Sequence, residues 1–142
     1  MTAKEYLKQL WWIDAEIDSK VRELDDLRSR AESCSSPKMS GMPKTEGGKD
    51  KISALIIKIV DLSTYIDMRT DKLIDLKARI TKQICGLRDQ RSRVILSCRY
   101  IRYEKWEQIE EELGYEKSYL QRLHRKALAE FERTYPEIKK QF

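Results

Sequence analysis

The segment WEQIEEELGYEKSYLQRLHRKAL, residues 106–128, changes the sign of its charge at a glycine. The acidic residues before the glycine are Glu107, Glu110, Glu111 and Glu112. Residues 115–128 then carry a net charge of +3, from four basic residues and one glutamate. A cationic helix gains free energy when it contacts phosphate, because condensed counterions are released. The chemistry that this segment offers is therefore anion binding.

The apolar residues around this glycine have the spacing of two helices. Ile109 and Leu113 precede Gly114, which can adopt the left-handed conformation that ends many helices. Leu120 and Leu123 then begin a second apolar stripe, which continues through Ala127, Leu128 and Phe131. Two helices joined by a tight glycine turn, with a supporting helix upstream, predict a helix-turn-helix.

The outer side of the helix predicted over residues 116–130 carries polar and basic side chains. We expect it to enter the major groove of double-stranded DNA, where such side chains contact base edges and phosphates. The expected DNA-binding residues are Lys117, Ser118, Tyr119, Gln121, Arg122, Arg125 and Lys126. Tyr119 has an equal alternative, which is packing on its own helix. The alternative for both charged runs is that they are solvated faces of a small helical bundle.

Three further expectations concern this helix and its neighbours. The glutamates of the acidic helix can pair with arginines of the preceding helix, such as Arg99 or Arg102. The apolar face of that preceding helix consists of Val94, Ile95, Cys98 and Ile101. The single histidine, His124, is expected to be an exposed helix residue and not a pH switch.

Metal binding and catalysis are not expected. The three cysteines share no CxxC spacing, and tetrahedral zinc needs four clustered ligands. Cys85 and Cys98 are therefore predicted to be small core residues. No nucleophile–base pair or phosphate-binding glycine loop is visible, so we expect neither an enzyme nor a cofactor. The scattered cysteines suit a reducing cytoplasm, and no apolar run is long enough to span a membrane.

The N-terminal half has the pattern of a long helical hairpin. Apolar residues recur at three- and four-residue steps over residues 3–32, and a similar series runs from Ile52 to Leu87 with Arg69 and Gln83 as its polar members. Residues 33–50, rich in Ser, Pro and Gly, predict a flexible loop between them. The predicted protein is all-α, with a hairpin or coiled coil over 1–85 and a helix-turn-helix domain over 86–142. Neither apolar seam can stay exposed, so each must find a partner in the same chain or in another. We expect a homo-oligomer formed through the N-terminal helices.

Residues 91–133 resemble the C-terminal promoter-binding domain of bacterial sigma factors, known as region 4. The matching features are VILSCRYI, then WEQIEEELGY, then a basic third helix that ends in KAL. The whole chain is also similar to small phage-encoded sigma-like regulators of Gram-positive bacteria, of the ArpU and RinA kind. The resemblance implies base reading by Lys117, Ser118 and Arg122, with Gln121 beside them and Arg125 and Lys126 along the DNA backbone. It also suggests contact with RNA polymerase.

Residues 1–85 contain nothing that resembles the DNA-melting domain of sigma factors. We therefore expect a sequence-specific transcriptional regulator of phage or mobile-element genes, in the cytoplasm of a bacterial host, and not a complete sigma factor. The alternative is a phage DNA-packaging adaptor, similar to the small terminase subunit, which would use the same helix-turn-helix to bind DNA.

Overall fold

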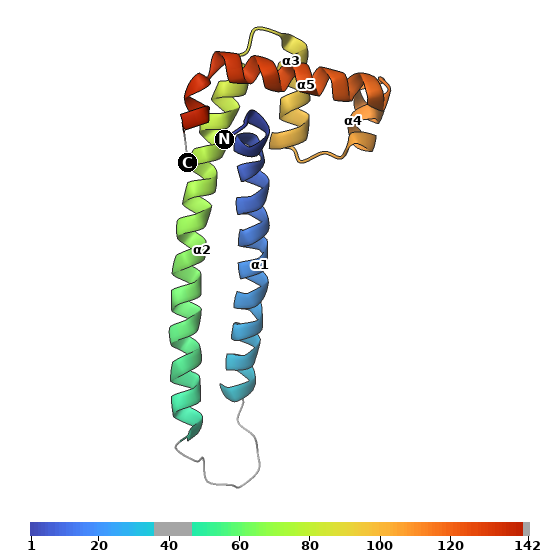
Figure 1. Cartoon of the computed structure of the whole chain (residues 1–142). Coiled ribbons are helices and arrows are strands. Elements are labelled where there is room, and N and C mark those ends of the chain that lie inside the picture. Colours follow the sequence, from blue (N-terminus) through green and yellow to red (C-terminus); the bar gives the residue numbers. More distant parts are fainter. Residues whose placement is uncertain (36–46, 141–142) are drawn as a thin grey trace. The chain divides into compact units, whose positions relative to one another are not determined.

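The elements of secondary structure are all helices over the residues that the computed structural model describes, 1–35 and 47–140 (Figure 1). Two long helices, α1 (Ala3–Ser35) and α2 (Gly47–Cys85), are followed by α3 (Gln90–Leu96) and a π-helical turn, η1 (Ser97–Ile101). The chain continues with α4 (Trp106–Leu113), α5 (Lys117–Thr134) and a short 3-10 helix, η2 (Pro136–Lys140). The predicted all-α class, with a long helical pair before shorter helices, is confirmed.

The predicted loop between the long helices is too long at both ends. α1 continues through Ser33 to Ser35, and α2 already begins at Gly47, so residues 33–35 and 47–50 are helical. The centre of the predicted loop, residues 36–46, lies outside the described residues. Helix propagation costs little once a helix has formed, which explains why α1 extends past the end of its apolar stripe.

The chain divides into two compact units, residues Asp14–Lys72 and residues Met1–Ile13 with Leu73–Phe142. The unit with the shorter helices thus includes residues from outside the predicted 86–142 domain, and that domain boundary stays a prediction. In the Asp14–Lys72 unit, parts of α1 and α2 lie antiparallel with Leu24 buried between half-buried apolar residues. Arg69, a polar member of the predicted seam, is paired there with Glu16, its Nε lying 3.0 Å from Glu16 Oε1.

The other unit has its core where the ends of the long helices meet α3, α4 and α5. The fully buried side chains from the long helices are Tyr6, Leu7, Leu10, Ile80 and Ile84, and those from the shorter ones include Ile95, Leu96, Ile109, Leu120 and Phe131. Gln83, the second polar seam residue, is satisfied in this core. Its Oε1 accepts a hydrogen bond from the Tyr6 hydroxyl at 2.8 Å, and its backbone carbonyl accepts one from the Tyr135 hydroxyl at 2.6 Å.

Across the described residues, none of the helices combines the length and the apolar character that crossing a membrane requires.

Candidate nucleic-acid interface

Local hydrogen bonds mark the start of α3 and both ends of α4. The Asp89 side chain caps α3 by accepting a hydrogen bond from the Arg91 backbone N–H at 2.9 Å. Gln108 Oε1 accepts one from the Lys105 backbone N–H at the start of α4, at 2.9 Å. Gly114 ends α4 with φ 71°, as its sequence position predicts, and its N–H donates to the Glu110 carbonyl at 2.8 Å. A short turn then leads directly into α5.

The inner side of α5 is apolar and buried, and this orientation determines which side chains face outward. Leu120, Ala127 and Phe131 are fully buried against the rest of the unit. They are seven and four residues apart, spacings that place side chains on one helix face. Glu130, on the edge of this face, accepts hydrogen bonds at Oε1 from the backbone N–H groups of Arg88 and Asp89, at 3.1 and 3.3 Å. α5 is thereby attached to the start of α3.

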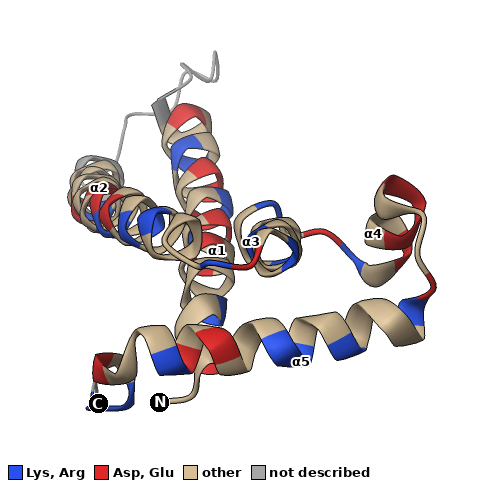
Figure 2. Cartoon of the chain, turned by 90° about the horizontal axis from the view of Figure 1, so that it is seen from above, with Lys and Arg blue, Asp and Glu red and all other residues tan. Residues whose placement is uncertain are grey.

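Most of the predicted DNA-binding residues are exposed on the outer side of α5. The exposed members are Lys117, Ser118, Gln121, Arg122, Arg125 and Lys126. Basic residues mark α5 along its length in Figure 2, whereas α4 carries acidic ones. The structure therefore brings these six residues together on the solvent side of a single helix.

Tyr119 is the half-buried member of the predicted set. Its hydroxyl accepts a hydrogen bond from Arg91 Nη1 at 3.2 Å, and its ring lies 4.8 Å from the Tyr115 ring. Both contacts are with groups of this chain, which favours the alternative of packing for Tyr119. Lys117 is also partly engaged, since its Nζ lies 3.9 Å from Glu107 Oε1. An exposed ion pair of this length contributes little to stability.

The predicted pairing of α4 glutamates with upstream arginines holds for Arg102. Its Nη2 lies 3.2 Å from Glu112 Oε1. Arg99 instead donates through Nη1 to the Glu104 carbonyl at 2.8 Å, and its guanidinium lies 4.9 Å from the centre of the Trp106 ring. Arg99 thus supports the loop before α4 through backbone and ring contacts.

His124 is buried, and the expectation of an exposed residue is wrong. It retains 8% of its accessible surface, and its Nε2 is hydrogen-bonded to the Tyr100 hydroxyl at 2.7 Å. Its ring also lies 5.2 Å from that of Trp106. Burial, followed by the positive charges of Arg99, Lys4 and Arg125, lowers the pKa of His124 to about 4. His124 lies between Leu120 and Ala127 at steps of four and three, so its position on the apolar stripe was the signal that could have found it.

The two cysteines that are predicted to be core residues differ in their exposure to solvent. Cys98 is buried at 3% exposure, whereas Cys85 is exposed, so the core assignment is wrong for Cys85. Cys85 lies beside the buried stripe of Ile80, Ile84 and Leu87 and not on it, so its side chain points away from the core. The pKa of the Cys98 thiol is raised, and burial is the largest cause.

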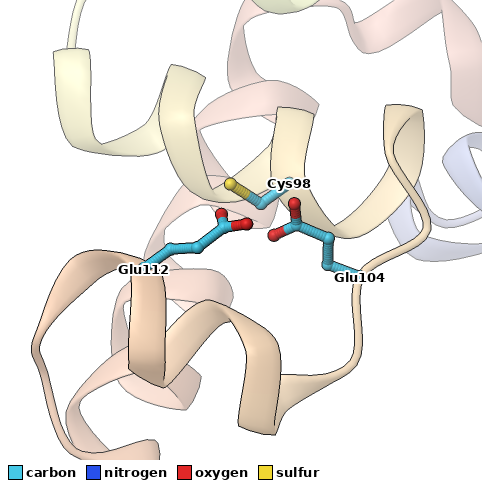
Figure 3. Close-up of side chains that lie close together, drawn as sticks. All are labelled: Cys98, Glu104 and Glu112. Carbon is cyan, nitrogen blue, oxygen red and sulfur yellow. The ribbon is translucent and has the colours of Figure 1, made fainter.

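Cys98 of η1, Glu104 of the loop before α4 and Glu112 near the end of α4 come together (Figure 3). One side-chain atom from each lies within 4.8 Å of the others. Arg102 Nη2 lies 2.6 Å from Glu104 Oε1, and Glu104 Oε2 is buried without a donor. Burial first, and then a hydrogen bond with Glu112, raise the pKa of Glu104.

The cluster has fewer ligand groups than structural zinc requires, because tetrahedral zinc takes four. The Arg102 guanidinium already provides positive charge at the carboxylates, and it would repel a metal cation there. We therefore assign the three side chains a structural part, which is to tie the loop before α4 to the end of α4. The expectation that the protein uses no metal stays a prediction.

Comparison with known proteins gives a family but no characterised relative. No curated protein and no solved structure matches the chain. Residues 33–132 match the model of a family described as "Protein of unknown function (DUF1492)". The match covers α2, α3, α4 and most of α5, which is well over half of the chain. The protein therefore belongs to the DUF1492 family.

Proposed function

We propose that this protein is a sequence-specific DNA-binding regulator of transcription that places α5 in the major groove. The observation that carries the proposal is the division of α5 into two faces. Leu120, Ala127 and Phe131 hold it in the core, and six polar or basic side chains are exposed on the other side. An exposed helix that presents Arg, Lys and Gln is suited to contact base edges and phosphates at the same time.

The charge distribution supports the orientation of the helix pair on DNA. The acidic helix α4 keeps its carboxylates on a neighbouring surface, where Glu112 pairs with Arg102 and Glu107 lies near Lys117. Phosphates would be repelled by α4 and attracted by α5, so α5 is the helix that approaches the DNA. The resemblance to sigma region 4 leads to the same assignment and adds RNA polymerase of a bacterial host as a proposed partner.

The outer side of α2 supports the proposed homo-oligomer. Ile57, Val60 and Met68 are 61%, 57% and 66% exposed. Their spacing along α2 places them on the side of the helix opposite the seam at Ile59 and Ile66. A second copy of the chain would cover this apolar stripe, and a dimer would present two α5 helices to two half-sites.

The helix assignment is tested by replacing Arg122 with alanine. The Arg122→Ala variant should lose about 1–3 kcal/mol of specific binding and relax its preference at one base pair. Arg22→Ala is the matched control, because it removes the same charge from an exposed site on α1. Fluorescence anisotropy with a selected duplex measures both. Equal affinity of Arg122→Ala and the parent protein would show that α5 does not read the DNA.

The oligomer is tested by sedimentation of the parent chain and of a Val60→Glu variant. A parent dimer that dissociates in the variant supports the regulator. A ring of many subunits that binds a packaging ATPase would instead favour a DNA-packaging adaptor, and a monomeric parent protein would exclude oligomerisation through α2.

A further inference from the structure

A basic pocket lies beside α5, within the unit that contains the shorter helices. It has a volume of about 540 Å³, within the range of roughly 300–1,000 Å³ that is typical of small-molecule sites. The N-terminal turns of α1, the turn η1, the loop before α4, and α5 all contribute side chains to it. The pocket therefore depends on the packing of the chain's N-terminus against the helix pair.

The pocket wall carries five cationic side chains and no carboxylate. The cations are Lys4, Lys8, Arg99, Lys105 and Arg125. In the part of the chain that the structure describes, none of the ion pairs involves any of these five. Like charges brought together repel one another, and a bound anion removes that repulsion. The lowered pKa of His124 is consistent with this repulsion. Burial is its largest cause, and the positive charges of Arg99, Lys4 and Arg125 follow.

Aromatic rings form most of the rest of the wall, together with Gln121. Trp11, Tyr100, Tyr103 and Trp106 line the pocket with His124. Trp106 is held in place, because the Arg99 guanidinium lies over its ring and the His124 ring packs against its edge. Trp11 remains 43% exposed. A flat ring can therefore stack in the same pocket in which a phosphate meets the cations, and stacking of a base on an aromatic side chain contributes about 1–3 kcal/mol.

We propose that this pocket binds a nucleotide, with its phosphate among the lysine and arginine side chains and its base against the indole rings. The nucleotide has two sources, a free mononucleotide or a nucleotide of a DNA strand that lies along α5. Gln121 and Arg125 belong both to the pocket and to the outer face of α5, so either source would join the pocket to the proposed DNA-binding surface. This inference goes beyond the proposed function, because a free nucleotide could bind even if α5 reads no DNA.

The test is a fluorescence titration of the full chain in low-salt buffer. A Trp12→Phe background removes the exposed indole that does not line the pocket, and leaves Trp11 and Trp106 as reporters. AMP, ADP, adenosine and inorganic phosphate are the probes. If a free nucleotide is the ligand, ADP and AMP quench the fluorescence saturably and bind more tightly than adenosine or phosphate alone, because only they engage both the cations and the rings.

Two charge-reversal variants show whether the pocket is responsible. Lys8→Glu should weaken ADP binding about tenfold or more, because it replaces a charge-assisted contact with a repulsive one. Lys72→Glu is the control, since it makes the same change at an exposed residue of α2 outside the pocket. Circular dichroism of both variants establishes that they are folded.

Binding of duplex DNA by the same variants distinguishes a free mononucleotide from a nucleotide of a DNA strand as the ligand of the pocket. If free nucleotides do not bind, but Lys8→Glu weakens duplex binding more than Lys72→Glu does, the pocket holds a nucleotide of the DNA. The proposal is overturned if millimolar ADP causes no saturable quenching and Lys8→Glu binds DNA like its control. Failure of the proposed function is a separate result, because it would appear as unchanged DNA binding by Arg122→Ala.

Discussion

Acid should destabilise this protein through His124. Its pKa is about 4 in the folded chain, against 6.5 for an ordinary histidine, because burial and nearby positive charges disfavour the imidazolium. Below pH 6.5 the unfolded chain therefore binds a proton that the folded chain does not bind until about pH 4. The neutral ring therefore makes its full contribution to the free energy of unfolding above pH 6.5. That contribution is lost as the pH falls towards 4. A gap of about 2.5 pKa units corresponds to roughly 3 kcal/mol.

The assay is urea unfolding followed by circular dichroism at pH steps between about 7 and 4. The parent protein is compared with His124→Gln, whose amide keeps a polar partner for the Tyr100 hydroxyl but does not titrate. The difference between the two removes the contributions of the other titrating groups, including the carboxylates with shifted pKa values. Tyr100→Phe is the control, because it loses the hydrogen bond and keeps the buried imidazole.

The free energy of unfolding of the parent should fall relative to His124→Gln by up to about 3 kcal/mol over this pH range. Tyr100→Phe should retain most of that dependence, since burial is the main cause of the low pKa. Parallel curves for the parent and His124→Gln would refute the reasoning, because they would mean that the imidazole takes up its proton equally in the folded and unfolded chains.

Three further predictions concern the helix pair. Gly114→Ala should lower the free energy of unfolding in urea by about 1–2 kcal/mol from its left-handed backbone alone, since no atom beyond its chain neighbours lies within 4 Å of an added Cβ. Gly114→Asn should cost less, and equal costs would argue against backbone strain. Glu104→Gln should gain stability relative to the parent as the pH rises above 4.5, because a raised carboxyl pKa stabilises the folded chain only while the group is protonated; a gain on acidification would contradict this. Lys117→Ala should change the free energy of unfolding by less than about 1 kcal/mol while weakening DNA binding, and a larger loss of stability would show that its pair with Glu107 is structural.

Local patterns predicted the elements of the helix pair well. The apolar steps around Ile109 and Leu120 and the glycine between them were sufficient, because helix stops and amphipathic stripes depend on residues close in sequence. The orientation of α5 followed from the same stripe, and it placed the exposed basic residues correctly. His124 is buried although histidine is a polar residue type, because its position continues the apolar stripe between Leu120 and Ala127.

Contacts between distant segments could not be predicted in the same way. The pocket depends on Lys4 and Lys8, which approach the shorter helices only because Tyr6 and Leu10 of the same helix are buried in their core. The Glu130 hydrogen bonds to the start of α3 also join residues more than 40 positions apart, at 3.1 and 3.3 Å. The spacing of apolar residues shows which face of a helix is buried, but it does not show which helix ends pack against one another.

The most direct test of the proposed DNA binding is selection of genomic duplex fragments by the purified full-length chain at about 50 mM and about 200 mM salt. We expect a recovered sequence motif with two spaced half-sites, and an affinity that falls steeply with salt because several basic residues of α5 contact phosphates. Failure to retain any duplex at the lower salt concentration, or retention without sequence preference, would contradict the assignment of α5 as a base-reading helix.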